Sequence, residues 1–192
     1  MWGGSAFGYT EWALADQKDP GPSALMIQIA SSHFHDMFYP GGAFSLESAL
    51  YWSLRSRTAK DEHPSAAQLD RGVNGFPMIQ ADDRAAGDIA FFNDWASHPD
   101  ADAYWKAIDG EQRARSLTAP VLLMAGWSDP FLPSQLRDFE EIRARADPRV
   151  ARESRLIIGP WSHAESVRFP DGTTGDAYRR ARLAKLSAVR TY

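Results

Sequence analysis

The chain has 192 residues, of which 44% are hydrophobic and 24% charged, and its formal net charge is −4. This composition is typical of a globular domain and excludes a disordered or fibrous protein. The absence of cysteine excludes disulfides, thiolate metal sites and a cysteine nucleophile, and the acidic balance argues against a nucleic-acid partner.

The first segment with a chemical signature is GGSAFG at residues 3–8. A nucleophile elbow places a Ser on a tight turn from strand to helix, which requires small neighbours. Here the pattern is G-x-S-x-x-G, with the second glycine one residue later than in the usual G-x-S-x-G. The segment is therefore either a nucleophile elbow around Ser5 or a loose glycine-rich terminus.

Three short apolar runs predict strands at 24–30, 120–125 and 155–159. Nearly continuous apolar runs bounded by Pro or Gly are typical of parallel strands covered on both faces. Between the second and third runs, an apolar stripe at helical spacing predicts a helix over 132–142. The stripe consists of Leu132, Leu136, Phe139 and Ile142. Strand, helix and strand form a βαβ unit, so the expected class is α/β.

The long stretch 31–118 differs from the rest of the chain. It is rich in aromatic residues and has helical patterns at 44–57, 88–96 and 101–109. A crossover between parallel strands needs only a dozen or so residues. The extra length predicts an inserted, mostly helical cap.

These patterns divide the chain into four expected segments. They are the elbow, helix and strand at 1–30, the cap at 31–118, the βαβ unit at 119–165 and a basic tail at 166–192. The Arg-rich tail fits a solvated helix or a frayed end better than a nucleic-acid contact.

Two chemically able residues directly follow the predicted strands. Asp129 comes after the second strand and His163 after the third. Catalytic groups in open α/β sheets lie just past the carboxyl ends of strands, and the order Ser, Asp, His is that of the α/β-hydrolases. Taken singly, Asp129 could cap the following helix and His163 could be a surface-loop residue. The three together predict a triad of Ser5, Asp129 and His163.

Two other groupings point to function only weakly. His33, His35 and Asp36 alternate like metal ligands, but a capping or loop role is favoured and no metal is expected. Asp82 and Asp83 could bind a substrate amine, although a solvated loop is the more ordinary explanation.

Several motifs together resemble the cocaine esterase-like hydrolases, the group that includes X-Pro dipeptidyl-peptidases and α-amino acid ester hydrolases. GGSAFGYTEWALA resembles the elbow and following helix of that family, GWSDPF at 126–131 its acid loop, and GPWSH at 159–163 its histidine loop. YPGGAF at 39–44 and DWASHPDADAYW at 94–105 resemble parts of its helical cap. The likeness covers about residues 1–165, with the motifs in the family's order.

The resemblance implies acyl transfer without a cofactor. Ser5 would attack the substrate carbonyl, His163 would relay its proton, and Asp129 would orient the imidazole. The backbone N–H of Ala6 would donate to the oxyanion. Trp52 and Phe131 would line the acyl pocket, with ordinary core packing as the alternative.

The resemblance also implies a partial fold. The family's elbow follows the fifth strand of an eight-stranded sheet, and its members continue into a β-sandwich. We therefore expect a fragment with about three of the hydrolase strands, in which strand 24–30 exposes an apolar edge. The expected substrate is a small ester or amide. The alternative is an inactive fragment or an interaction module. With no apolar run long enough for a bilayer and no visible signal peptide, a cytoplasmic location without a membrane or nucleic-acid partner is expected.

Overall fold

The computed structural model describes residues 1–58, 62–163, 168 and 171–174. The expected basic tail at 166–192 therefore lies outside the described residues, apart from a few positions.

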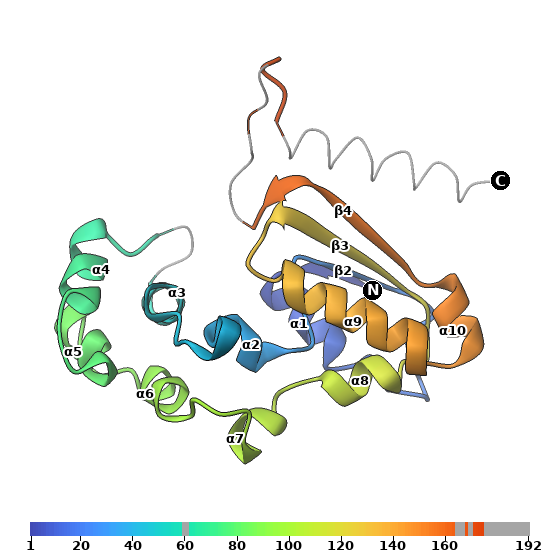
Figure 1. Cartoon of the computed structure of the whole chain (residues 1–192), viewed down its shortest axis with the longest axis horizontal. Helices are drawn as coiled ribbons and strands as arrows, with labels where there is room; N and C mark the ends of the chain where they lie inside the picture. The colour runs from blue at the N-terminus through green and yellow to red at the C-terminus, as the bar shows by residue number, and fades with distance from the viewer. Residues whose placement is uncertain (59–61, 164–167, 169–170, 175–192) are drawn as a thin grey trace. The chain divides into compact units, whose positions relative to one another are not determined.

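The chain divides into two compact units, whose elements are labelled in Figure 1. Unit 1 joins Met1–His33 to Gly110–Tyr192, and unit 2 is the continuous segment Phe34–Asp109.

Unit 1 is built on a parallel sheet whose four described strands lie in the order β1-β2-β3-β4. They are β1 (Trp2–Gly4), β2 (Leu25–Gln28), β3 (Val121–Ser128) and β4 (Arg155–Ser162). The three strands predicted from apolar runs are confirmed as β2, β3 and β4. The last two continue about three residues further than predicted, because their pairing extends to Ser128 and Ser162 beyond a register shift.

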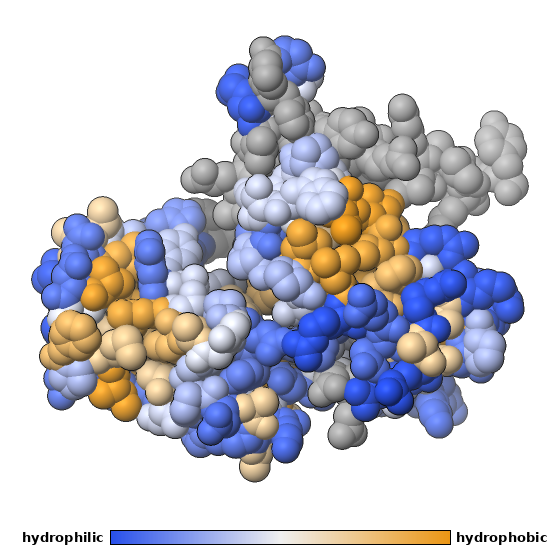
Figure 2. Space-filling view, viewed as in Figure 1, coloured by the Kyte–Doolittle hydropathy of each residue, from blue (hydrophilic) through white to orange (hydrophobic). Residues whose placement is uncertain are grey.

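Strand β2 is not an edge strand. All three residues of β1 pair with β2, from Trp2 opposite Met26 to Gly4 opposite Gln28. The expectation that 24–30 would expose an apolar edge is therefore wrong. The outer strands of the described sheet are β1 and β4, and residues 156–158 of β4 are half-buried. Figure 2 shows apolar side chains gathered where β3 and β4 lie in Figure 1.

The described helices of unit 1 are α1 (Ala6–Trp12), α8 (Glu111–Arg115), α9 (Leu132–Arg145) and α10 (Pro148–Glu153). Helix α9, which runs along the sheet in Figure 1, confirms the helix predicted over 132–142. Its buried face differs from the predicted stripe: Ile142 is buried, but Leu136 is 39% exposed. Gln135 and Asp138 face inward instead, because each has a backbone or side-chain hydrogen-bond partner in the interior.

The core of unit 1 lies between the sheet and its helices. Its buried residues are Trp12, Ala15, Leu25, Ile27, Ala30, Ala114, Leu117, Val121, Leu123, Ile142 and Val150. Because β2, β3, α1, α9 and α10 all contribute, this core fixes β3, the strand that Asp129 follows.

Unit 2 is mostly helical. Its helices are α2 (Phe34–Phe38), α3 (Leu46–Arg55), α4 (Ala66–Val73), α5 (Ala81–Ala85), α6 (Ala90–Ser97) and α7 (Ala103–Lys106), with 3-10 turns η1 (Pro40–Gly42) and η2 (Met78–Gln80). Its core is aromatic: the rings of Phe38 and Trp95 stack at 4.2 Å, and Trp105 is fully buried.

The two ends of unit 2 are tied together. The carboxylate of Asp109 accepts hydrogen bonds from the backbone N–H groups of Phe34 and His35, at 2.5 and 2.9 Å. Within unit 1, the N–H of Gly110 donates to the carbonyl of Ser32 at 2.7 Å. The outgoing and returning chain segments therefore lie side by side.

No helix within the described ranges is long and apolar enough to cross a membrane.

Candidate active site

Ser5 lies on a strained turn between β1 and α1. Its backbone has φ 55° and ψ −125°, a conformation that residues other than glycine rarely adopt. A Cβ atom on Gly3 would lie 2.8 Å from the backbone of Phe7, and one on Gly8 would lie 2.8 Å from the Cβ of Ala30. The late second glycine is therefore required, because Gly8 faces β2 whereas Phe7 is 75% exposed.

The structure brings Ser5, His163 and Asp129 together. Ser5 Oγ lies 2.8 Å from His163 Nε2, and His163 Nδ1 lies 3.0 Å from Asp129 Oδ2. Both distances fall within hydrogen-bonding range. Ser5 and Asp129 are about equally close to the imidazole of His163, and the pairing of β1 with β2 holds Ser5 in position.

Asp129 decides which atoms donate and which accept in the hydrogen bonds that link it to His163 and Ser5. The Asp129 side chain is buried, and its carboxylate can only accept. The proton on His163 is therefore placed on Nδ1, which leaves Nε2 to accept from the hydroxyl of Ser5. Asp129 Oδ1 also accepts from the N–H of Phe131 at 2.8 Å. The carboxylate thus stabilises its own loop as well as orienting the imidazole.

The backbone around Ser5 decides which N–H can face an oxyanion. The N–H of Ser5 donates to the carbonyl of Gln28 at 3.0 Å and is already used. Ala6 is the first residue of α1, so its N–H has no partner within the helix. Of these two donors, Ala6 is the one that remains available for an oxyanion, and that role stays a prediction.

The two predicted pocket residues fall in different units. The ring of Phe131 is 7% exposed and lies 5.2 Å from the ring of His163, centroid to centroid. Phe131 therefore contacts the site directly. Trp52 is half-buried on α3 of unit 2, and its pocket role stays a prediction.

A buried carboxylate fixes the segment that follows β2. Asp138 on α9 accepts hydrogen bonds from the N–H and the hydroxyl of Ser32, at 3.1 and 2.5 Å. His33 Nε2 lies 3.7 Å from the same carboxylate. Burial raises the pKa of Asp138, and the nearby His33 and the Ser32 hydrogen bonds oppose that rise. Sequence reasoning missed this cluster, because an Asp on a helix carries no signal of burial.

The other two groupings have structural roles. His35 lies in unit 2, where its ring stacks on Tyr39 and Nε2 is 3.0 Å from the carbonyl of Pro99. The expectation of a solvated loop is wrong for Asp82. It is fully buried on α5 and accepts a hydrogen bond from the N–H of Ile89 at 2.6 Å. In the part of the chain that the structure describes, no three His, Cys, Asp or Glu residues are arranged to hold a metal ion.

One carboxyl group near the elbow is buried without a hydrogen bond. Glu11 on α1 is 2% exposed, and neither of its oxygens has a hydrogen-bond partner. Burial raises the pKa of Glu11 from 4.5 to about 7, against smaller opposing effects of the Met26 backbone and the amino terminus.

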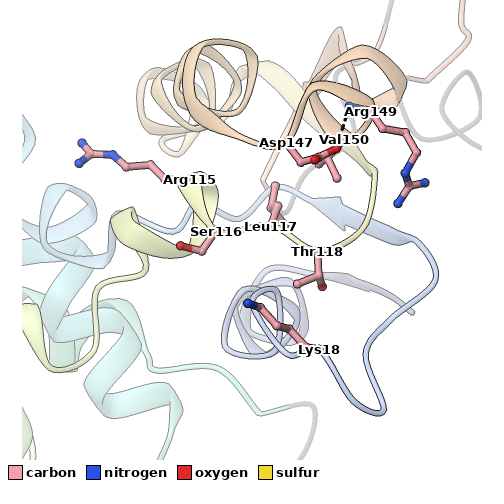
Figure 3. Close-up of a pocket in the computed structure, with 8 residues that line it drawn as sticks. All are labelled: Lys18, Arg115, Ser116, Leu117, Thr118, Asp147, Arg149 and Val150. Carbon is pink, nitrogen blue, oxygen red and sulfur yellow. Dashed lines mark hydrogen bonds between the residues drawn. The ribbon is translucent and has the colours of Figure 1, made fainter.

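A cavity of about 640 Å³ lies near the amino ends of the strands, away from the triad. Figure 3 shows its lining, which includes Lys18, Arg115 and Arg149. In that view the Arg115 guanidinium points away from the residues around Leu117. Arg115 pairs with Glu141 at 2.8 Å, so its charge is already matched.

Comparisons with known proteins identify the fold and the family of the chain. A cocaine esterase from Rhodococcus sp. (strain MB1 Bresler) is 29% identical over 182 residues, covering 85% of this chain and 31% of the relative. An aminopeptidase structure from the marine sediment archaeon Thaumarchaeota archaeon is 24% identical, with a TM-score of 0.66 over 93% of this chain and 32% of that one. A selenomethionine-labelled α-amino acid ester hydrolase is 18% identical, with a TM-score of 0.58 over 85% of this chain and 28% of that one.

The structural matches establish the α/β-hydrolase fold, and the chain spans about a third of the length of these relatives. The family model described as X-Pro dipeptidyl-peptidase (S15 family) matches residues 1–165, which include all three members of the candidate triad. The chain therefore belongs to the X-Pro dipeptidyl-peptidase (S15) family.

Proposed function

We propose that this chain carries the catalytic triad of a serine hydrolase that cleaves carboxylic esters or amides through an acyl-enzyme. The observation that carries the proposal is the hydrogen-bonded series Ser5 Oγ, His163 Nε2, His163 Nδ1 and Asp129 Oδ2, at 2.8 and 3.0 Å. Membership of a hydrolase family supports it.

In the proposed acylation, Ser5 Oγ attacks the substrate carbonyl while His163 Nε2 takes the hydroxyl proton. The buried Asp129 carboxylate stabilises the resulting imidazolium. The Ala6 N–H donates to the oxyanion. As the tetrahedral intermediate collapses, the bond to the leaving group breaks and Nε2–H protonates that group. Water then repeats the sequence to release the acid and free Ser5.

The proposed substrate is a small ester or amide that places its acyl group beside Phe131. The cocaine esterase at 29% identity favours an ester. The ring of Phe131 beside His163 offers an apolar wall for such a group. No cofactor enters the proposed reaction.

The test uses a fluorophosphonate probe, which phosphonylates an activated serine, on the chain as it stands. We expect labelling of the wild type at Ser5, mapped by mass spectrometry, and none in Ser5→Ala. Ser128→Ala is the matched control, since Ser128 is exposed and also lies in a G-x-S pattern. Labelling that persists in Ser5→Ala, or disappears in Ser128→Ala, would overturn the assignment of the nucleophile.

A second candidate, a non-catalytic interaction module, is favoured by one observation. Trp2 on the outer strand β1 and Phe7 on α1 are each 75% exposed, which is unusual for large apolar side chains. A folded wild-type chain that resists the probe and fails to hydrolyse p-nitrophenyl acetate would favour this alternative over the hydrolase.

A further inference from the structure

Ile29 has an unusual backbone conformation. Its φ is 42°, and within the described part of the chain Ser5 is the other non-glycine residue with a positive φ. A β-branched side chain is strongly disfavoured in this region, so the surrounding structure must stabilise it. The two strained residues follow directly on the neighbouring strands β1 and β2.

The peptide group between Gln28 and Ile29 links the strand of the nucleophile to the strand of the acid. Its carbonyl accepts from the N–H of Ser5 at 3.0 Å. Its N–H donates to the carbonyl of Met124 on β3 at 2.8 Å. The turn at Ile29 therefore begins immediately after the peptide that ties the two strands together.

The side chain of Ile29 packs beside the residue that precedes the nucleophile. It is 8% exposed, and its Cγ1 lies 3.8 Å from the position that a Cβ on Gly4 would take. The next residue, Ala30, contacts the helix after the nucleophile, because its carbonyl accepts from Trp12 Nε1 at 3.4 Å. Residues 28–30 thus contact the elbow before, at and after Ser5.

We infer that Ile29 is a positioning residue for Ser5: its side chain holds Gly4 in place and so fixes the direction in which Ser5 presents Oγ to His163. A glycine would adopt φ 42° without strain, so the isoleucine must contribute through its side chain. Because Ser5 is itself strained, it relaxes once a neighbour that confines it is removed. This inference rests on the proposed function, since it assigns Ile29 a part in the same site.

The experiment compares Ile29→Gly with Ile29→Val, using the rate of fluorophosphonate labelling, kcat and KM for p-nitrophenyl acetate, and the midpoint of thermal unfolding. In Ile29→Gly we expect labelling and kcat to fall about 10-fold or more, since small misplacements of reacting groups are costly. KM should change little. The unfolding midpoint should fall, because the loss of a buried side chain and the more flexible unfolded chain outweigh the relief of strain, so rates are compared at a temperature at which the variant is folded. Ile29→Val keeps Cγ1 and should recover most of the rate.

Ile27→Val is the matched control, because Ile27 is fully buried in the same strand and belongs to the core. It should lower the unfolding midpoint and leave the labelling rate unchanged. Wild-type labelling in Ile29→Gly, or an equal loss of rate in Ile27→Val, would overturn the inference.

A readout independent of activity separates this inference from the proposed function. Nitrogen-15 NMR of the His163 ring reports the hydrogen bond that Nε2 accepts from Ser5. Loss of that signature in Ile29→Gly, with recovery in Ile29→Val, supports the positioning role even if the wild type is not labelled. An unchanged His163 spectrum in Ile29→Gly would contradict it, whatever the activity.

Discussion

The two units of this molecule bury different kinds of side chain. Of the buried polar residues in the described ranges, ten lie in unit 1 and three in unit 2. The core of unit 2 is mainly aromatic, whereas that of unit 1 is largely aliphatic around a sheet. Buried polar groups are costly unless they are paired, so their concentration in unit 1 needs an explanation.

The buried polar residues of unit 1 are explained by where they lie around the sheet. Ser32, Asp129 and Asp138 in unit 1 have hydrogen bonds that fix loops at the carboxyl ends of β2 and β3. In unit 2, the carboxylate of Asp82 accepts from the N–H of Ile89 within a core of packed helices. Buried polar groups in unit 1 therefore hold the loops that carry the proposed reacting groups, whereas the interior of unit 2 is mainly packed aromatic side chains.

The largest effect is expected for Asp129→Asn. The amide keeps the shape of the side chain but can hold His163 in the wrong tautomer, so kcat/KM should fall by about 10³–10⁴-fold. Steady-state ester hydrolysis measures the loss, and circular dichroism shows whether the fold is kept. Asp100→Asn in unit 2, where Asp100 is exposed, should leave turnover unchanged. A kcat/KM of Asp129→Asn within tenfold of the wild-type value would contradict the contrast between the units.

Trp105→Ala should destabilise unit 2. Trp105 is fully buried, and its Nε1 donates to the carbonyl of His98 at 2.6 Å, so truncation should cost about 3–5 kcal/mol. Hydrogen exchange should show lost protection in α3 and α6 while β2 and β3 stay protected. Trp127→Ala is the control, because Trp127 is 68% exposed and its loss should change stability little. Equal loss of protection in both units would show that their stabilities are not separate.

Glu11→Gln should change how the stability of unit 1 depends on pH. The folded pKa of Glu11 is raised to about 7, so the folded chain keeps a proton that the unfolded chain releases above pH 4.5. The free energy of unfolding of the wild type should therefore fall as pH rises from 4.5 to 7, by up to about 3 kcal/mol, and then level off.

The glutamine variant lacks that titration. It should match the wild type near pH 4 and exceed it in stability at pH 8, as measured by thermal unfolding across this range. Glu47→Gln, at an exposed position in unit 2, is the control and should give parallel curves. A constant difference between Glu11→Gln and wild type at all pH values would rule out a buried, titrating carboxyl.

The smallest effect is expected for Ser65→Ala. Ser65 caps α4 through a capping box with Gln68, in which each residue bonds the backbone of the other. Its loss should cost about 1 kcal/mol and increase exchange at the first turn of α4, with no change in labelling of Ser5. Ser48→Ala on α3, whose hydroxyl is exposed, provides the comparison. A large change in the labelling of Ser5 would show that unit 2 has a role beyond its own packing.

Sequence reasoning worked best where a pattern is set by local physics. Apolar runs bounded by Pro or Gly located β2, β3 and β4, and the residues just past two of them, Asp129 and His163, lie together as expected. Short strands show no such pattern. Strand β1 spans only Trp2–Gly4, and its pairing with β2 is seen only in the structure.

Tertiary contacts explain the other differences. Leu136 fits the apolar stripe of α9, yet Gln135 takes the inner position because a carbonyl of β3 accepts its amide hydrogen. Ile29 carries no signal of its left-handed turn, since isoleucine is among the residues least suited to it. Its conformation depends on contacts with residues far away in the sequence.

The hydrogen bonds that Asp109 accepts from Phe34 and His35 affect the order of folding. Unit 1 is assembled from two segments separated by the whole of Phe34–Asp109, and closing a flexible loop of that length costs on the order of 4 kcal/mol in chain entropy. Unit 2 is continuous and can form while the later strands are still unmade. Once Asp109 holds Phe34 and His35, the ends of that loop are already close, and β2 can meet β3 at little further cost. Pulse-labelling hydrogen exchange during refolding should therefore detect protection in α3 and α6 before β3 and β4.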